Sequence, residues 1–221
     1  MFDLTAYHLH DLTHSFDNET EGFSTKATRN VEKDGWNAAN LSIYSHAGTH
    51  MDAPLHFGVS QQSIDQIGLR DMMGTAWLIR VNVQEKQQLI TIKDLGKIQE
   101  RFQPGDSLLI HTNWSLERGE SHYRSGLPRI SEELAGWCVD HQVKILGVEP
   151  ASVADVNNLP EVTQIHQILL GGGVVIVEGL VGLDQIMGEQ VFLMALPLKV
   201  KGGDGAPARV IAFEKKALSN A

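Results

Sequence analysis

The chain has 221 residues, of which 42% are hydrophobic and 20% are charged, and its formal net charge is -9. This composition is that of an ordinary globular protein, so it predicts one domain over 1–221 with a full hydrophobic core and argues against disorder. The negative charge argues against nucleic acid and against a membrane surface as partners, because both attract clustered Lys and Arg.

The sequence shows no feature that would direct the chain into a membrane or out of the cell. No apolar run reaches the roughly 18 residues of a transmembrane helix. No basic stretch followed by an apolar block begins the chain, so we expect no signal peptide. The single cysteine, Cys138, cannot form an intrachain disulfide and is expected to pack in the core. These features predict a cytoplasmic protein.

In chain order, the first forty residues are polar and irregular, and we expect either a loop that covers a site or a plain surface segment. Short β-branched and aliphatic runs predict strands at 40–45, 75–83, 107–111, 144–148, 174–178, 190–200 and 209–214. Apolar spacing, capping residues and a terminal glycine predict helices at 91–100, 131–141 and 161–170. Strands mixed with helices predict an α/β or α+β domain.

A histidine-rich segment follows the first predicted strand. His46, His50 and Asp52 offer two imidazoles and a carboxylate, which are ligands that divalent ions such as Zn²⁺ and Mn²⁺ accept. Gly48 lets the backbone fold tightly so that the two histidines converge. Pro54 stiffens the turn after Asp52. We therefore predict a metal site here in preference to a turn that merely contains histidines.

Three residues outside this motif are further candidates. His56 lies just beyond the proline and is a candidate acid–base group, because imidazole titrates near neutral pH. Glu178 ends an apolar run, where a buried carboxylate is costly unless it is paired or bound to a metal. His166 lies in the predicted helix 161–170, and a glycine turn brings the chain back towards Glu178. The alternatives are a polar helix face for His166 and a surface strand end for Glu178.

Other aromatic and imidazole side chains have weaker claims to a role. No Gly-x-Ser-x-Gly elbow is present, which argues against a serine hydrolase. We expect His8, His10 and His14 to lie at the surface. Residues that could face a substrate, with core packing or plain surface as the alternative, are His111, Trp114, Phe16, Phe23 and Trp36.

The segment from His46 to Phe57 resembles the His-x-Gly-Thr-His-x-Asp-x-Pro-x-His-Phe signature of the cyclase family, which includes bacterial kynurenine formamidases (arylformamidases) and isatin hydrolases. The resemblance extends over most of the chain, through 11–14, 112–114 and 196–209. It implies a mixed-sheet α/β fold, the swivelling β/β/α domain. One departure is that 16–23 lacks the Trp-Pro-Gly segment that lines the formamidase pocket, so the substrate stays open.

The resemblance also implies a role for each matching residue. His46, His50 and Asp52 would bind a first metal ion, and Asp52 could bridge to a second ion completed by His166 and Glu178. His56 matches the acid–base histidine of the family. The cofactor would be Zn²⁺ or Mn²⁺, with one or two ions per chain.

The implied activity is hydrolysis of a non-peptide carbon–nitrogen bond by metal-activated water, as in the arylformamidases of tryptophan catabolism. The substrate would be a small-molecule amide or lactam, and the chain would form a homodimer or homotetramer. The alternatives are an isatin-hydrolase-like cyclic amidase, a true cyclase or dehydratase, and a metal-binding homologue without catalysis. Retention of His56 favours an enzyme.

Overall fold

Eight strands form one mixed β-sheet in the computed structural model, which describes residues 3–216. The strands are β1 (Tyr7–Asp11), β4 (His50–Asp52), β5 (Met73–Arg80), β7 (Ser107–His111), β9 (Ile145–Val148), β10 (Val175–Glu178), β11 (Gln190–Pro197) and β12 (Gly205–Lys215). Their order is β1-β12-β11-β5-β7-β9-β10-β4. Because β4 also pairs with β12, the strands β12, β11, β5, β7, β9, β10 and β4 form a closed ring of pairings.

The parallel strands β5, β7, β9 and β10 form the centre of the sheet. Both faces are covered, so these strands are mostly hydrophobic and buried and do not alternate between apolar and polar residues. In β7, Leu108 and Ile110 join one hydrophobic cluster, and Leu109 joins the other. The sheet therefore separates two cores.

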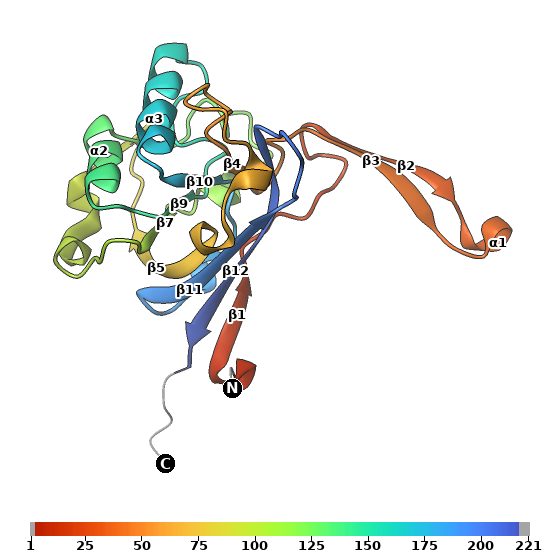
Figure 1. The fold of residues 1–221 in the computed structure, drawn as a ribbon, viewed down its shortest axis with the longest axis horizontal. Coiled ribbons are helices and arrows are strands. Elements are labelled where there is room, and N and C mark those ends of the chain that lie inside the picture. The colour runs from red at the N-terminus through yellow and green to blue at the C-terminus, as the bar shows by residue number, and fades with distance from the viewer. Residues whose placement is uncertain (1–2, 217–221) are drawn as a thin grey trace.

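Two α-helices cover one face of the sheet (Figure 1). The helix α2 spans Glu132–Asp140, and the helix α3 spans Leu159–Gly171. The Ser131 side chain caps α2 by accepting from the Leu134 amide, and Asn158 caps α3 in the same way. Cys138 is fully buried in the core between α2 and the sheet, as expected. Within residues 3–216, no helix is both long enough and apolar enough to span a bilayer.

The remaining regular elements are short. The strands β6 (Leu89–Ile90) and β8 (Arg129–Ile130) form a separate parallel pair. The 3-10 helices are η1 (Leu4–Ala6), η2 (Ile64–Gln66), η3 (Leu69–Asp71), η4 (Ile92–Glu100), η5 (Trp114–Glu117) and η6 (Leu183–Gln185). The helix predicted at 91–100 is present as η4, which is a 3-10 helix and is kinked at Gly96, whose φ of 52° and ψ of -133° interrupt the helical backbone.

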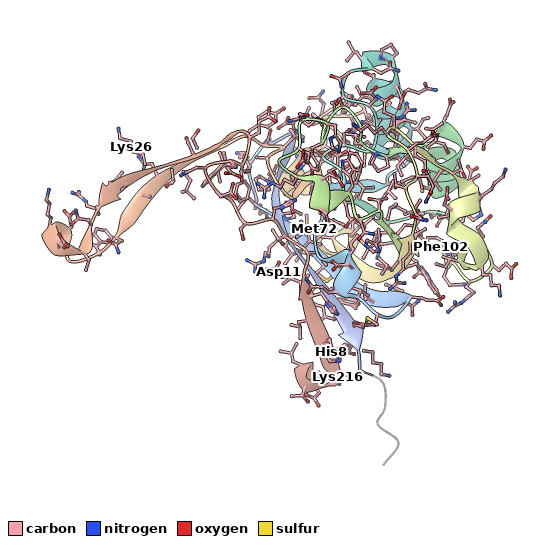
Figure 2. All side chains as sticks on the ribbon, turned by 180° about the vertical axis from the view of Figure 1, so that it is seen from behind. His8, Asp11, Lys26, Met72, Phe102 and Lys216 are labelled. Carbon is pink, nitrogen blue, oxygen red and sulfur yellow. The ribbon has the colours of Figure 1, made fainter. Side chains whose placement is uncertain are left out.

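A hairpin made of β2 (Phe23–Arg29) and β3 (Ala38–Ile43) projects from the body of the molecule, with the single-turn helix α1 (Val31–Asp34) at its tip (Figure 1). Figure 2 shows Lys26 on this arm, far from the sheet. The arm corrects two expectations. The first forty residues include β1, β2 and part of β3, so they are not irregular throughout; most of them are exposed at the surface, and 19–22 line a cavity. The strand predicted at 40–45 pairs with β2 outside the main sheet, so it stays exposed.

Candidate metal centre

The pairing of β4 with β10 brings the predicted ligands together. These strands are antiparallel, and His50 stands opposite Glu178 in the register. Asp52 lies two residues along β4, so its side chain is on the same face as His50. His166 reaches the same point from α3, the helix that leads into β10. Residues far apart in the sequence therefore meet because of one strand pairing and one helix.

Two carboxylates and two imidazoles face one another at this point. His50 Nε2 lies 3.2 Å from Glu178 Oε2, and His166 Nε2 lies 3.4 Å from Glu178 Oε1. Asp52 Oδ1 is 3.7 Å from His50 Nε2, and Asp52 Oδ2 is 3.6 Å from His166 Nε2. All four side chains are at least 95% buried. The two Nε2 atoms and the carboxylate oxygens thus point into one small volume.

Backbone carbonyls set the orientation of both rings. The Nδ1–H of His50 donates to the Gly48 carbonyl over 3.0 Å, and that of His166 donates to the Val162 carbonyl over 2.7 Å. A carbonyl can only accept, so in a neutral ring the proton lies on Nδ1 and the lone pair on Nε2. This arrangement is common for histidines that bind metals.

His46 and His56 form a second group beside the first. His46 Nδ1 lies 2.9 Å from Asp52 Oδ1, and His46 Nε2 lies 3.0 Å from Asp204 Oδ2. The His56 ring stacks on the His46 ring at a centroid distance of 3.8 Å. His56 Nδ1 lies 3.6 Å from the same Asp204 oxygen. Sequence reasoning did not select Asp204, although a lone carboxylate between glycines, at 202–205, was a usable signal.

The donor atoms fit a divalent ion. Asp52 Oδ2 is buried and has no hydrogen-bond partner within residues 3–216. A buried carboxylate oxygen without a partner is costly, and a bound cation would satisfy it. Two sets of three residues hold ligand atoms within 4.8 Å of one another, and both include Asp52: His46–Asp52–His56 and His50–Asp52–Glu178. The geometry accommodates one ion, or two with Asp52 between them.

The charges of the site also favour a bound cation. Burial alone would raise the pKa of Glu178, but contacts with His166 and His50 hold that pKa well below its usual range. Burial alone would lower the pKa of His46, but the hydrogen bonds and charges of Asp52 and Asp204 raise it to about 9. The carboxylates thus stabilise positive charge on the neighbouring imidazoles. A divalent cation bound here would be stabilised by the same carboxylates.

Two glycines allow the close approach of these segments. A Cβ on Gly205 would lie 2.7 Å from His46 Cε1 and 2.9 Å from the Met51 carbonyl oxygen. Gly179 has a φ of +69°, and a Cβ there would lie 2.5 Å from the Gly48 carbonyl oxygen. Both positions therefore require glycine for the loop of His46 to lie against β10 and β12.

A cavity of about 550 Å³ opens beside the metal centre and shares His46 with it. A second, smaller cavity of about 110 Å³ lies directly over the metal-ligand cluster. Residues that line both are Tyr44, His46, Arg124 and Ala151. The larger cavity therefore adjoins the cluster of imidazoles and carboxylates.

Some of the other histidine and aromatic candidates from the sequence lie near this site, and others lie far from it or in the interior. His8 is exposed, but His14 is half-buried and lines the larger cavity, which corrects its expected surface position. Phe16 packs against Phe23 and lies next to Gly48. Trp36 is exposed on the projecting arm. Trp114 packs in the protein interior, where its indole N–H donates to the Tyr123 carbonyl.

Solved structures share this fold. Isatin hydrolase A from Ralstonia solanacearum matches with a TM-score of 0.86 and 24% identity, covering 96% of this chain and 93% of that chain. A protein described as a potential metal-dependent hydrolase with cyclase activity matches with a TM-score of 0.75 and 27% identity, covering 96% of this chain and all of that chain. The expected mixed α/β fold is confirmed.

Curated sequences point to the same group. The kynurenine formamidase of Salinibacter ruber is 30% identical over 187 residues, which cover 84% of each chain. Residues 10–155 match the family model described as "Putative cyclase". This match includes the whole histidine-rich segment and confirms the resemblance seen in the sequence. The chain therefore belongs to the cyclase family.

Proposed function

We propose that this protein is a metal-dependent hydrolase of a non-peptide carbon–nitrogen bond, with an aryl formamide as substrate. The observation that carries the proposal is the buried Asp52 Oδ2, which has no hydrogen-bond partner within residues 3–216 and lies in a cluster of imidazoles and carboxylates. The names of the relatives, kynurenine formamidase and metal-dependent hydrolase, support the class of reaction. The cavity beside the cluster supports a small-molecule substrate.

The candidate ligands are the five residues predicted from the sequence. The family resemblance groups His50 with His46 and Asp52 on a first ion, but the 3.2 Å distance between His50 Nε2 and Glu178 Oε2 favours a different division. His50, His166 and Glu178 would hold one ion and His46 the other, and Asp52 would be shared. Imidazole and carboxylate suit both Zn²⁺ and Mn²⁺, so we propose one of these two metals. A divalent ion held by these residues would supply a bound water with a pKa near 7 and would polarise a carbonyl.

His56 is the proposed acid–base group. Burial lowers the pKa of His56, so the ring is neutral near pH 7 and can accept a proton. It would take this proton from the attacking water and deliver it to the leaving nitrogen, which departs as an amine. The stacked His46 ring and the nearby Asp204 carboxylate hold His56 at the edge of the cluster.

We propose that the chain is a single domain and works as a homodimer or homotetramer. A cytoplasmic location stays a prediction from the composition.

The proposal is tested by metal analysis of the wild type and of Asp52→Ala, followed by assays against N-formylkynurenine and isatin. We expect one or two equivalents of Zn or Mn in the wild type, less in the variant, and turnover of the formamide. Turnover of isatin alone would replace the formamide with a lactam substrate. No bound metal after reconstitution would refute the metal-dependent mechanism.

A further inference from the structure

Arg124 lines both cavities of the site and carries a guanidinium group. Its guanidinium donates to Glu21, which lies at the rim of the larger cavity. Both side chains are substantially exposed, 50% for Arg124 and 78% for Glu21. Ion pairs of this exposure contribute little free energy, so an anion entering the cavity can replace Glu21 at low cost.

The other arginine of the larger cavity is already engaged. Arg118 donates to His14 Nδ1 over 3.1 Å and to Thr20 Oγ1 over 2.7 Å, and it lies 3.6 Å from Asp17. These contacts tie Arg118 to the wall. Arg124, by contrast, has only the exposed Glu21 as a side-chain partner within residues 3–216.

Tyr123 adds a neutral donor next to Arg124. Its side chain lines the same cavity, and its hydroxyl makes no hydrogen bond within residues 3–216. Burial raises the pKa of Tyr123 to about 12, so the hydroxyl keeps its proton. The Tyr123 backbone is held in place, since its carbonyl accepts from the Trp114 indole. Tyr123 and Arg124 thus line the same cavity, and a phenol O–H and a guanidinium can both donate to an oxygen anion.

We propose that Arg124 is a specificity-determining residue that binds a carboxylate on the amide substrate, with the Tyr123 hydroxyl as a second donor. The inference rests on the proposed function for the scissile amide and adds a distinct anionic group on the same molecule. Glu21 pairs with Arg124 in the absence of substrate and is displaced by the carboxylate.

The test compares substrates that differ only by a carboxylate: formanilide, which is neutral, and the three isomeric formamidobenzoates. We expect the wild type to prefer at least one formamidobenzoate. Arg124→Gln should lower kcat/KM for that isomer about tenfold, mainly through KM, because a charge-assisted hydrogen bond is lost. Hydrolysis of formanilide should change less than about twofold. Equal losses for both substrates would overturn the inference.

Arg101→Gln is the matched control. Arg101 is as exposed as Arg124 and is also paired with a glutamate, Glu189, but it lines a different cavity. It therefore removes the same net charge without touching the site. A loss of preference in this control equal to that of Arg124→Gln would assign the effect to overall charge and refute the role of Arg124.

Calorimetry of benzoate binding to the metal-loaded protein tests carboxylate binding by Arg124 without relying on hydrolysis. Affinity should fall about tenfold in Arg124→Gln and less in Tyr123→Phe, and it should rise in Glu21→Gln because a competitor is removed. Equal affinity in the wild type and in Arg124→Gln would show that benzoate binds at another place, such as the metal ion. That result would refute the role of Arg124 even if the protein hydrolyses formanilide. Weaker binding in Arg124→Gln without any hydrolysis would refute the proposed function alone.

Discussion

His50 and Glu178 stand opposite each other in the antiparallel pairing of β4 with β10, and their nearest side-chain atoms are 3.2 Å apart. Because each residue belongs to a buried strand, their separation is set by the backbone register of the sheet and does not depend on a flexible loop. A metal site built in this way is rigid. Single substitutions can therefore separate the roles of its side chains.

Glu178→Gln should remove metal while the fold persists. The glutamine oxygen can still accept the Val153 amide hydrogen bond, which is 2.8 Å in the wild type, but the negative charge is lost. We expect the loss of at least one metal equivalent, measured by elemental analysis after dialysis. Glu214→Gln is the control, since Glu214 is also buried and accepts backbone amides from Met187 and Gly188. Full metal content in Glu178→Gln would remove Glu178 from the ligand set.

His56→Ala should abolish turnover and leave the metal content unchanged. Loss of an acid–base group typically lowers the rate by about 10²–10⁴-fold. His56 also belongs to a set of residues that could hold an ion, together with His46 and Asp52. Metal analysis of the same preparation therefore decides between the two roles, and a fall in metal content would make His56 a ligand.

His14 should make the protein less stable in mild acid. Burial, and then the charge of Arg118, lower the pKa of His14 from 6.5 to about 4. Between these values the unfolded chain binds a proton that the folded chain does not, so the stability present above about pH 6.5 is lost as the pH falls towards 4.

The measurement is the free energy of unfolding in urea at several pH values between 4 and 7. His14→Gln should make its pH dependence shallower by up to about 1.4 kcal/mol per pH unit. His8→Gln, at an exposed position on β1 (Figure 2), is the matched control for the loss of a histidine. A slope equal to that of the wild type in His14→Gln would contradict the assignment.

Gly205→Ala should disturb the site through packing alone. The added methyl group would collide with the His46 ring and with the Met51 carbonyl, and the backbone of β4 cannot move freely because β10 and β12 hold it on both sides. We expect about 1–3 kcal/mol of destabilisation and reduced metal content. Gly136→Ala on α2 is the control: no atom lies within 4 Å of its Cβ, so it should stabilise by about 0.5–1 kcal/mol. A neutral effect of Gly205→Ala would mean that His46 can shift without consequence.

The sequence by itself predicted the candidate ligands that the structure brings close together. His46, His50 and Asp52 are local to one segment, and their residue types and spacing carry chemical meaning without any fold. The apolar run before Glu178 also indicated a buried carboxylate, because burial of such a run is a property of its composition. The buried strands 107–111 and 144–148 were close to the observed β7 and β9 for the same reason.

The tertiary structure decided what depended on contacts between distant segments. Asp204 meets His46 across 158 positions of sequence, and no local pattern can specify such a contact. The strand at 40–45 had the right propensity, but its partner is β2, so it forms an exposed arm. The position of Arg124 beside the site could not be predicted from the sequence, because it depends on the tertiary contact that places Arg124 at the cavity and next to Glu21. Local composition determines which side chains can do chemistry, and strand pairing determines which of them meet, because the pairing energy comes from the whole sheet.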